Sequence, residues 1–306
     1  MWLNVRSTTA FRVSRLLFGM AAVSLTAPLS AQKIMTSADL TSLSAPPPDA
    51  RIPYGPGPLQ FGNLRLPKSA GPHQVVVFIH GGCWLSEYNI THAEAAEQGL
   101  ADAGYAVWSL EYRRVGDEGG GWPGTFQDIA KGADYLRQIA GKYSLDLRRV
   151  VAAGHSAGGE FALWLASRRK IPPTSELFSP DPLVIRGVLG LAPAPDLEGL
   201  QSNGVCDHVI DKLMGGSPSE HPDRYAVTSL MQLAPVTVPS VLVIGAHDRS
   251  WGPVGRSYLA RAIAAGDQGV RVVEAPDAGH FEIINPASSS WPLVTDALKE
   301  LFARLR

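Results

Sequence analysis

The sequence contains little cysteine and no excess of charge, and both shortages narrow the classes of protein to which it can belong. Two cysteines among 306 residues fit neither a disulfide-rich scaffold nor a zinc site built on C-x-x-C pairs. The eight histidines do not recur at metal-ligand spacing, so we expect no metal site. A net charge of −1 without runs of lysine and arginine argues against binding to nucleic acid.

Long hydrophobic runs are also lacking, and the apolar stretch at 16–27 is too short for an ordinary membrane span of about 20 residues. Three arginines precede this stretch and the small residue Ala31 follows it, an order typical of a secretory signal peptide. We therefore predict that residues 1–31 are a signal peptide. The mature protein would then be exported, periplasmic or secreted, and would have no stable membrane span. The alternative is an uncleaved segment that tethers the protein to the membrane, because Leu29 suits the cleavage site poorly.

The remaining residues have the composition of an ordinary globular domain, with 45% apolar and 18% charged residues. Residues 32–53, rich in serine, threonine and proline, are predicted to be a linker or N-terminal arm. From residue 54 to 306, strand-like and helix-like segments alternate, which indicates one α/β domain. We expect a mostly parallel central sheet with helices on both faces.

A long connection follows the strand-like run that ends at Ala192. Nearly fifty residues separate it from the next such run, which begins at Ser240, and insertions of this length are commonly lids or binding loops. We predict a short cap at about 197–235, between the sixth and seventh strands. Extra packing at the sheet edge is the alternative interpretation.

The pentapeptide GHSAG at 154–158 carries the main chemical signal of the chain. It lies between a strand-like run at 149–153 and a helix-like stretch at 160–166. Strand, sharp turn and helix are the context of a nucleophile elbow, in which small flanking residues permit the tight turn. We therefore predict that Ser156 is a nucleophile. Taken alone, the motif also fits a glycine-rich turn without a chemical role.

Two further residues complete a triad in a known chain order. Asp248 and then His280 each follow a short apolar run, giving the order nucleophile, acid, histidine. A histidine with an ordinary pKa near ~6.5 can take the serine proton, and the acid can fix its tautomer. Asp196 remains an alternative acid because it also follows a strand-like run.

Three neighbouring residues are weaker candidates for these roles. His247 is expected at a strand end, and Glu274 at a solvated or edge position. Asp277 is too close to His280 in the chain to reach across the site easily.

A second motif, HGGCW at 80–84, follows the apolar run 75–79, and we call it the oxyanion loop for its expected role. Glycines at this place allow backbone N–H groups to approach a developing oxyanion, and the N–H of Ala157 is expected to be another donor. For His80 we favour a role in bracing the loop over a role in proton transfer.

These motifs resemble α/β-hydrolases of the esterase and lipase type. The similar group contains hormone-sensitive-lipase-like carboxylesterases, kynurenine formamidases and xylan acetyl or feruloyl esterases, and the resemblance runs from about Tyr54 to the C-terminus. The matching positions are HGGCW at 80–84, EYRR at 111–114, GHSAG at 154–158, Asp248 and GHF at 279–281.

The resemblance implies an α/β-hydrolase fold and acyl transfer through a covalent acyl-enzyme without a cofactor. It also implies that Gly82 and Cys83 donate to the oxyanion, together with Ala157, while Gly81 shapes the turn. Lipase-like members often have a third glycine where this chain has Cys83, followed here by Trp84. This departure favours the formamidase and small-acyl esterase branch.

We therefore predict a serine carboxylic ester hydrolase that acts on small or aryl esters and needs neither metal nor cofactor. An arylformamidase or amidase-type hydrolase is the first alternative. A non-catalytic binding module is the second, although such modules normally lack the nucleophile. The expected partner is a small-molecule ester or amide, and the sequence does not indicate an oligomeric state.

Four side chains are candidates for the substrate pocket, with plain core packing as the alternative: Trp84, Trp122, His155 and Phe281. A disulfide between Cys83 and Cys206 would tie the predicted cap to the oxyanion loop. Two free buried thiols are the other possibility.

Overall fold

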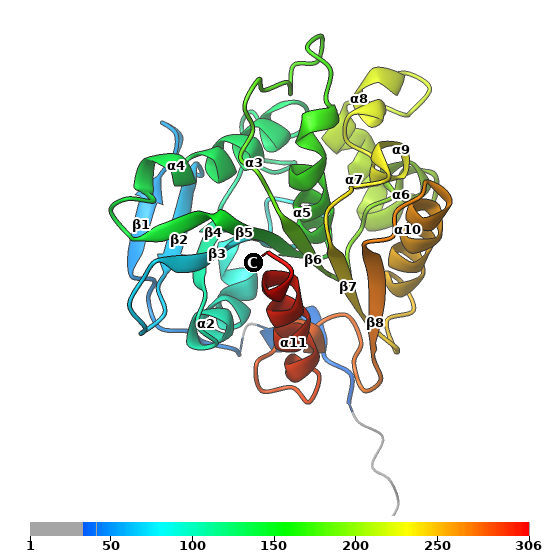
Figure 1. Cartoon of the computed structure of the whole chain (residues 1–306). Coiled ribbons are helices and arrows are strands. Elements are labelled where there is room, and N and C mark those ends of the chain that lie inside the picture. Colours follow the sequence, from blue (N-terminus) through cyan, green and yellow to red (C-terminus); the bar gives the residue numbers. More distant parts are fainter. Residues whose placement is uncertain (1–32, 41, 306) are drawn as a thin grey trace, which may run out of the picture. The chain divides into compact units, whose positions relative to one another are not determined.

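Eight strands form one central sheet in the order β1-β2-β4-β3-β5-β6-β7-β8 (Figure 1). The computed structural model describes residues 33–40 and 42–305, so the predicted signal peptide lies outside the described residues. Of these strands only β2 runs opposite to the others, so its pairings with β1 and β4 are antiparallel and all other pairings are parallel, which confirms the expected mostly parallel arrangement. The strands are β1 (Ala50–Pro53), β2 (Phe61–Arg65), β3 (His73–Ile79), β4 (Ala106–Leu110), β5 (Leu145–His155), β6 (Gly187–Leu191), β7 (Ser240–Gly245) and β8 (Val270–Ala275).

The central strands are apolar because helices cover both of their faces. Every residue of β4, β6 and β7 is buried, as are Val75–Ile79 in β3. Branched side chains such as these suit a fully buried parallel strand. In the register of the sheet, Ile79 pairs with Gly154 and His155 pairs with Leu191. The carboxyl ends of β3, β5 and β6 therefore meet at one edge, where ligands bind in open α/β sheets.

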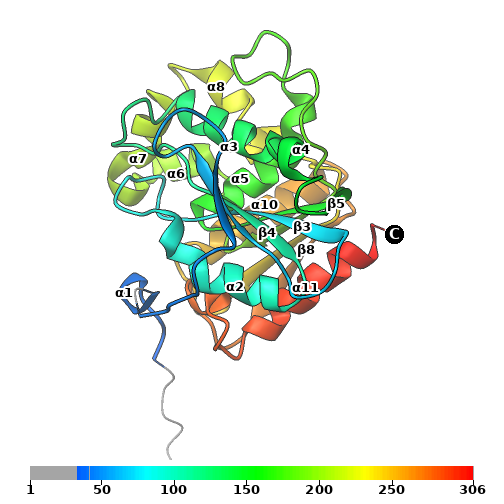
Figure 2. The ribbon, with the colours of Figure 1, turned by 90° about the vertical axis from the view of Figure 1, so that its left-hand side faces the viewer.

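Two helical layers enclose the sheet (Figures 1 and 2). One face is covered by α2 and α11, and their apolar residues form one hydrophobic cluster with that face. The other face is covered by α3, α4, α5 and α10, which share a second cluster. These helices are α2 (Glu94–Asp102), α3 (Gly124–Asp134), α4 (Leu136–Ile139), α5 (Ala157–Ser167), α10 (Gly252–Ala264) and α11 (Trp291–Ala303).

The segment expected to be a linker contains regular structure. A short helix, α1 (Ser37–Leu40), lies in it, and β1 begins at Ala50, before the expected domain start at residue 54. Pairing of β1 with β2 explains the difference, because a sheet edge supplies hydrogen bonds even to a proline-containing strand. Residues 34–306 belong to one compact unit.

Short helices fill the connection between β6 and β7, where the cap was expected. They are α6 (Leu197–Ser202), α7 (Val205–Met214), α8 (Pro222–Ala226) and α9 (Leu230–Leu233). Apolar residues of these helices join the same cluster as α5 and α10, so much of the insertion is core packing. Among the described residues, none of the helices has the length and apolar character that crossing a membrane requires.

Candidate functional site

Ser156 occupies a strained turn between β5 and α5. Its φ of 54° and ψ of −120° lie in a region that side chains rarely adopt. A Cβ added at Gly158 would come within 2.1 Å of the Ile79 carbonyl oxygen, and one at Gly154 within 2.1 Å of the Gly158 carbonyl oxygen. The two flanking glycines are therefore required by close backbone approach, and the turn sets Ser156 at the carboxyl edge of the sheet.

Asp248 and His280 meet from the loops that follow β7 and β8. The Nδ1 of His280 donates to Asp248 Oδ2 at 2.7 Å, and the N–H of Trp251 donates to Asp248 Oδ1 at 2.9 Å. Burial alone would raise the pKa of Asp248, but the hydrogen bond and charge of His280, with backbone donors, hold the pKa below its usual value. The ionised carboxylate fixes the proton on Nδ1 and leaves Nε2 as the basic nitrogen.

Ser156 and His280 line one small cavity of about 120 Å³. Within the described chain no hydrogen bond joins their side chains, a contact that is often long in free enzymes and tightens with substrate. The cavity is bounded by Ser37, Gly82, Cys83, Tyr88, His92, His155, Ser156, Trp251, His280 and Phe281. We term it the inner cavity.

The oxyanion loop has an unusual backbone. Gly82, Cys83 and Trp84 have φ values of 116°, 51° and 57°, so three consecutive residues lie in the left-handed half of conformational space. In the described part of the chain, no hydrogen bond uses the N–H groups of Gly82, Cys83 or Ala157. Ala157 begins α5, where first-turn N–H groups have no partner within the helix. These donors are therefore available beside Ser156.

Buried polar groups brace this loop from behind. The fully buried ring of His80 lies 2.8 Å from the Gly81 carbonyl oxygen and 3.1 Å from Glu111 Oε1. Glu111 also accepts from the Ile90 N–H and pairs with Arg114 at 3.0 Å. Burial raises the pKa of Glu111, but these partners, led by His80, bring it below the usual value. Glu111 was singled out in the sequence without a role, and the structure shows its bracing contacts.

Two of the four predicted pocket residues lie away from the inner cavity, which corrects the expectation for Trp84 and Trp122. Trp84 is completely buried in the hydrophobic core, where a ring of its size gains most from desolvation. Trp122 faces the cap: its backbone N–H donates to the Leu213 carbonyl at 2.7 Å, and its ring lies 5.5 Å from the Arg224 guanidinium carbon. His155 and Phe281 do line the cavity.

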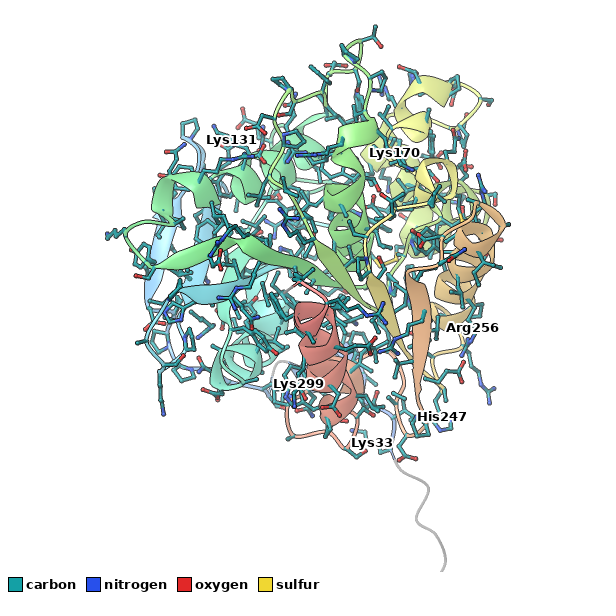
Figure 3. All side chains as sticks on the ribbon, viewed as in Figure 1. Lys33, Lys131, Lys170, His247, Arg256 and Lys299 are labelled. Atoms are coloured by element: carbon teal, nitrogen blue, oxygen red, sulfur yellow. A yellow bond between two sulfur atoms is a disulfide. The ribbon has the colours of Figure 1, made fainter. Side chains whose placement is uncertain are left out.

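The residues considered as alternatives to Asp248 and His280 either have other partners or lie on the surface. Asp196 Oδ1 accepts from the Gly199 N–H at 2.9 Å and so caps α6. Glu274 pairs with Arg256 at 2.7 Å, and Asp277 is exposed. His247 is also exposed and lies at the lower edge of the molecule in Figure 3. Of the described residues, no three from His, Cys, Asp and Glu lie close enough together to hold a metal ion.

A chain of two further histidines supports the backbone of His280. The His155 Nε2 donates to the His280 carbonyl oxygen at 2.9 Å, which leaves Nδ1 to accept from His92 Nε2, also at 2.9 Å. Burial, together with the nearby rings of His80 and His280, lowers the pKa of His92 to about 3. Burial likewise places the pKa of His155 well below 6.5, with added effects of His280 and His92. Both rings are therefore neutral near pH 7.

Sequence reasoning missed four residues of the inner cavity. Trp251 stacks with His280 at a ring distance of 5.7 Å, and its position three residues after Asp248 was an available signal. Tyr88 and His92 come from the segment after the oxyanion loop, which has no motif of its own. Ser37 comes from the segment expected to be a linker.

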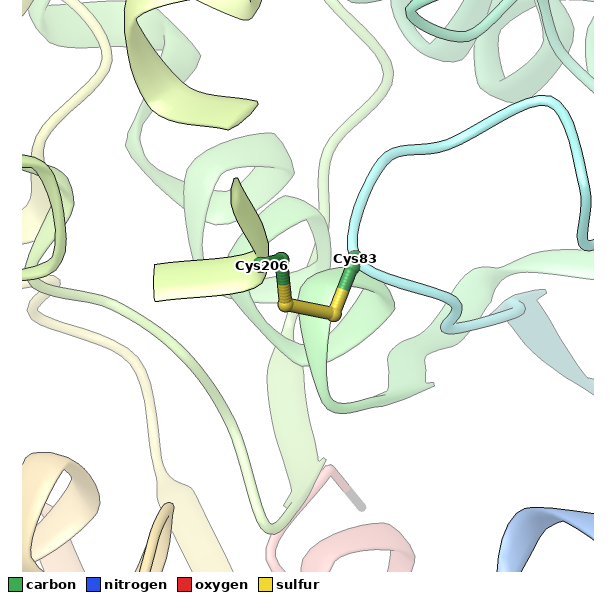
Figure 4. The surroundings of a disulfide bond; sticks show 2 residues. All are labelled: Cys83 and Cys206. Carbon is green, nitrogen blue, oxygen red and sulfur yellow. A yellow bond between two sulfur atoms is a disulfide. The ribbon is translucent and has the colours of Figure 1, made fainter. Parts of the chain in front are cut away.

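A disulfide joins the oxyanion loop to the cap (Figure 4). Cys83 lines the inner cavity, and Cys206 lies near the start of α7, 123 residues later in the chain. The backbone of 206–208 is left-handed, so α7 is interrupted where the bridge attaches. The bridge couples the position of α7 to an expected oxyanion donor.

Comparisons with known proteins agree with this fold. The BD-FAE family model matches residues 63–259. Esterase LipC of Mycobacterium tuberculosis is 25% identical over 248 residues, and the match covers 78% of this chain and 60% of LipC. A probable isoprenylcysteine alpha-carbonyl methylesterase of Arabidopsis thaliana is 30% identical over 112 residues, covering 36% of this chain and 23% of that protein. The chain thus spans less than two thirds of either relative.

A solved structure extends the likeness to nearly the whole domain. Esterase B from Lactobacillus rhamnosis, inhibited by a tributyrin phosphonate, superposes with a TM-score of 0.75 and 22% identity. The match covers 88% of this chain and 90% of esterase B. The expected α/β-hydrolase fold is thereby confirmed.

Proposed function

Since the chain belongs to the BD-FAE family, we propose that it is a serine hydrolase that cleaves carboxylic esters of small or aryl groups. The observation that carries the proposal is the 2.7 Å contact of His280 with Asp248 beside a cavity that Ser156 also lines. The esterase names of both relatives support the ester as substrate. Inhibition of esterase B by a phosphonate supports a nucleophilic mechanism.

In the first half of the proposed reaction, Ser156 Oγ attacks the ester carbonyl carbon. His280 Nε2 takes the hydroxyl proton, and Asp248 stabilises the resulting imidazolium. Negative charge develops on the carbonyl oxygen, where the N–H groups of Gly82, Cys83 and Ala157 are the available donors. The tetrahedral intermediate then collapses: the ester C–O bond breaks, the alcohol leaves with the proton from His280, and the acyl group stays on Ser156.

The second half repeats the same steps with water as the nucleophile. His280 removes a proton from the water, whose oxygen attacks the acyl carbon. The Ser156–acyl bond then breaks, the carboxylic acid is released, and the proton returns to the serine oxygen through His280. No atom of the enzyme is consumed, and the cycle requires no cofactor.

The test compares Ser156→Ala with the wild type, using protein that starts at residue 32. The substrates are p-nitrophenyl acetate, butyrate and octanoate, methyl ferulate and N-formylkynurenine. We expect rapid ester cleavage that declines with acyl length and that falls by several orders of magnitude in Ser156→Ala. Ser257→Ala, a serine exposed on α10, is the matched control and should retain full activity.

Other outcomes redirect or reject the proposal. Preference for N-formylkynurenine would assign the protein to the formamidase type. Turnover that survives Ser156→Ala would reject the nucleophile. A folded wild type that neither cleaves esters nor reacts with a fluorophosphonate would favour a binding module.

We also propose that the protein is exported. The Cys83–Cys206 bridge supports this, because disulfides persist in oxidising compartments. Fractionation of cells that express the whole chain should recover a shortened protein outside the cytoplasm, whereas a full-length protein in the membrane fraction would indicate a tether.

A further inference from the structure

The segment Ile34–Leu40, which we call the arm, is attached to the loop that carries His280. The N–H of Met35 donates to Glu282 Oε1, while Glu282 Oε2 accepts from the N–H of Gly279 at 2.8 Å. One carboxylate thus holds both the arm and the residue before His280. Ile34 lies so close to Gly279 that a Cβ there would come within 2.5 Å of it. At the other end of the arm, Leu40 is 8% exposed and joins the hydrophobic cluster below the sheet.

The arm also borders the inner cavity and a second one beside it. Ser37 lines the inner cavity together with Ser156 and His280. The second, which we call the outer cavity, has a volume of about 310 Å³ and shares Ser37, Tyr88 and His92 with the inner one. The two spaces therefore adjoin, and the arm forms a wall of both.

The volume of each cavity limits which part of an ester it can hold. Small-molecule sites usually occupy about 300–1,000 Å³, whereas the inner cavity has about 120 Å³. The inner cavity can therefore hold only the reacting carbonyl and a small substituent. Any larger part of a substrate must extend out of it, and the outer cavity is adjacent.

We propose that the arm and the outer cavity form a second substrate subsite, which binds the part of the ester that lies beyond the scissile bond. The inference rests on the proposed esterase function and adds to it the segment that selects substrates by size and charge. It assigns a binding role to residues of the N-terminal arm, far in sequence from the triad.

The lining of the outer cavity indicates what it would accept. Its polar residues include Ser37, Glu87, Asn89 and Thr91, while Tyr88 and Leu40 contribute apolar side chains. Glu87 is the one acidic residue in this lining, and no cation accompanies it while His92 is neutral. The subsite should therefore prefer a neutral substituent with hydrogen-bonding groups over an anionic one or a long alkyl chain.

The first experiment narrows the outer cavity without touching the triad. Ala38, exposed in the arm, lines the outer cavity alone, so Ala38→Trp should obstruct only that space. Ser44→Trp, an exposed position just after the arm that lines neither cavity, is the matched control. The substrates are vinyl acetate, which is small on both sides, 4-methylumbelliferyl acetate, which has a large alcohol, and vinyl 3-phenylpropanoate, which has a large acyl group.

We expect Ala38→Trp to lower kcat/KM about tenfold or more for one of the two large esters, mainly through KM, and to leave vinyl acetate within about twofold. Which large ester suffers will show whether the subsite holds the alcohol or the acyl part. Equal effects of Ala38→Trp and Ser44→Trp on all three esters would overturn the proposal. If the esterase assignment were wrong, none of the three esters would be cleaved. Retained cleavage of vinyl acetate therefore shows that only the subsite proposal has failed.

A second variant tests the charge without adding bulk. Glu87 is exposed, so Glu87→Gln should fold normally. We expect it to improve kcat/KM for 4-carboxyphenyl acetate about threefold to fivefold relative to phenyl acetate, the size of effect expected for one unit charge a few ångströms away in water. These two esters differ only in the alcohol, so this test applies where Ala38→Trp impairs cleavage of the ester with the large alcohol. An unchanged ratio of the two rates would then overturn the proposed role of Glu87 in selecting the substrate by charge.

Discussion

The strained backbone at Ser156 suits its proposed role as the nucleophile. Its φ of 54° is maintained because β5 and α5 are both packed in the core, and the glycines on either side allow the two elements to approach. The neighbouring residues of the site depend on hydrogen bonds instead. Asp248 is held by the N–H of Trp251, and His280 by Asp248 on one side and by His155 on the other.

For a single residue of the site, we predict the effect of Asp248→Asn. The amide would present a donor or a weaker acceptor to His280 Nδ1, so the ring would adopt the wrong tautomer and lose its carboxylate partner. We expect kcat to fall about 10⁴-fold, as in other triads, with little change in fold. Steady-state kinetics and circular dichroism measure both quantities.

Asp196→Asn is the matched control, because Asp196 caps α6 and should affect stability rather than turnover. If Asp196→Asn were inactive while Asp248→Asn kept near-normal kcat, the assignment of the acid would be reversed.

At the scale of elements, the site is assembled from loops at the carboxyl ends of neighbouring strands. β3 leads into the oxyanion loop, β5 into Ser156, β7 into Asp248 and β8 into His280. The rigid sheet sets the spacing of these loops, and the Cys83–Cys206 bridge adds a covalent link to α7. This bond joins the cap to the oxyanion loop, whereas none of the residues from 197 to 235 is among those that line the inner cavity.

We predict that Cys206→Ala destabilises the protein by about 2–5 kcal/mol, because the bridge closes a loop of more than a hundred residues in the unfolded chain. Urea unfolding with and without a reductant measures the effect. The reductant should bring the wild type close to the variant and leave the variant unchanged. Titration that finds two free thiols in denatured, unreduced wild type would contradict this prediction.

At the scale of the whole molecule, buried neutral histidines link folding to pH. Burial lowers the pKa of His92 to about 3, whereas an unfolded histidine has a value near ~6.5. Between these values the unfolded chain binds a proton that the folded protein excludes, so stability falls as the pH falls. His155, with a pKa well below 6.5, acts in the same direction.

We therefore predict that the free energy of unfolding decreases less steeply between pH 6.5 and about 3 in His92→Gln than in the wild type. Glutamine can still donate to His155 Nδ1 but takes up no proton. The expected difference is at most about 1.4 kcal/mol per pH unit. Urea unfolding at a series of pH values gives the slopes, with the exposed His247→Gln as the control. Identical slopes for His92→Gln and the wild type would show that His92 is not buried neutral.

The fold and the candidates for the triad could be predicted from the sequence because each leaves a pattern within a few consecutive residues. A buried parallel strand needs a continuous apolar run, and an elbow needs small residues around its serine, so both appear as short patterns. The rest of the site had no such pattern. Trp84 and Trp122 seemed suited to a pocket, yet one is buried in the core and the other contacts the cap. Side-chain direction depends on the surrounding packing, which a list of residue types does not contain.

The α/β-hydrolase fold, the alternation of its elements and the candidate residues Ser156, Asp248 and His280 could be predicted from the sequence. These features follow from hydrophobic periodicity and from steric demands within a few residues. By contrast, the folded domain is needed to see that Ser37, Tyr88 and His92 border the same cavity and that Glu282 joins the arm to the His280 loop. These contacts bridge up to 247 residues of chain. Such contacts arise from the packing of the whole domain and have no local steric signature.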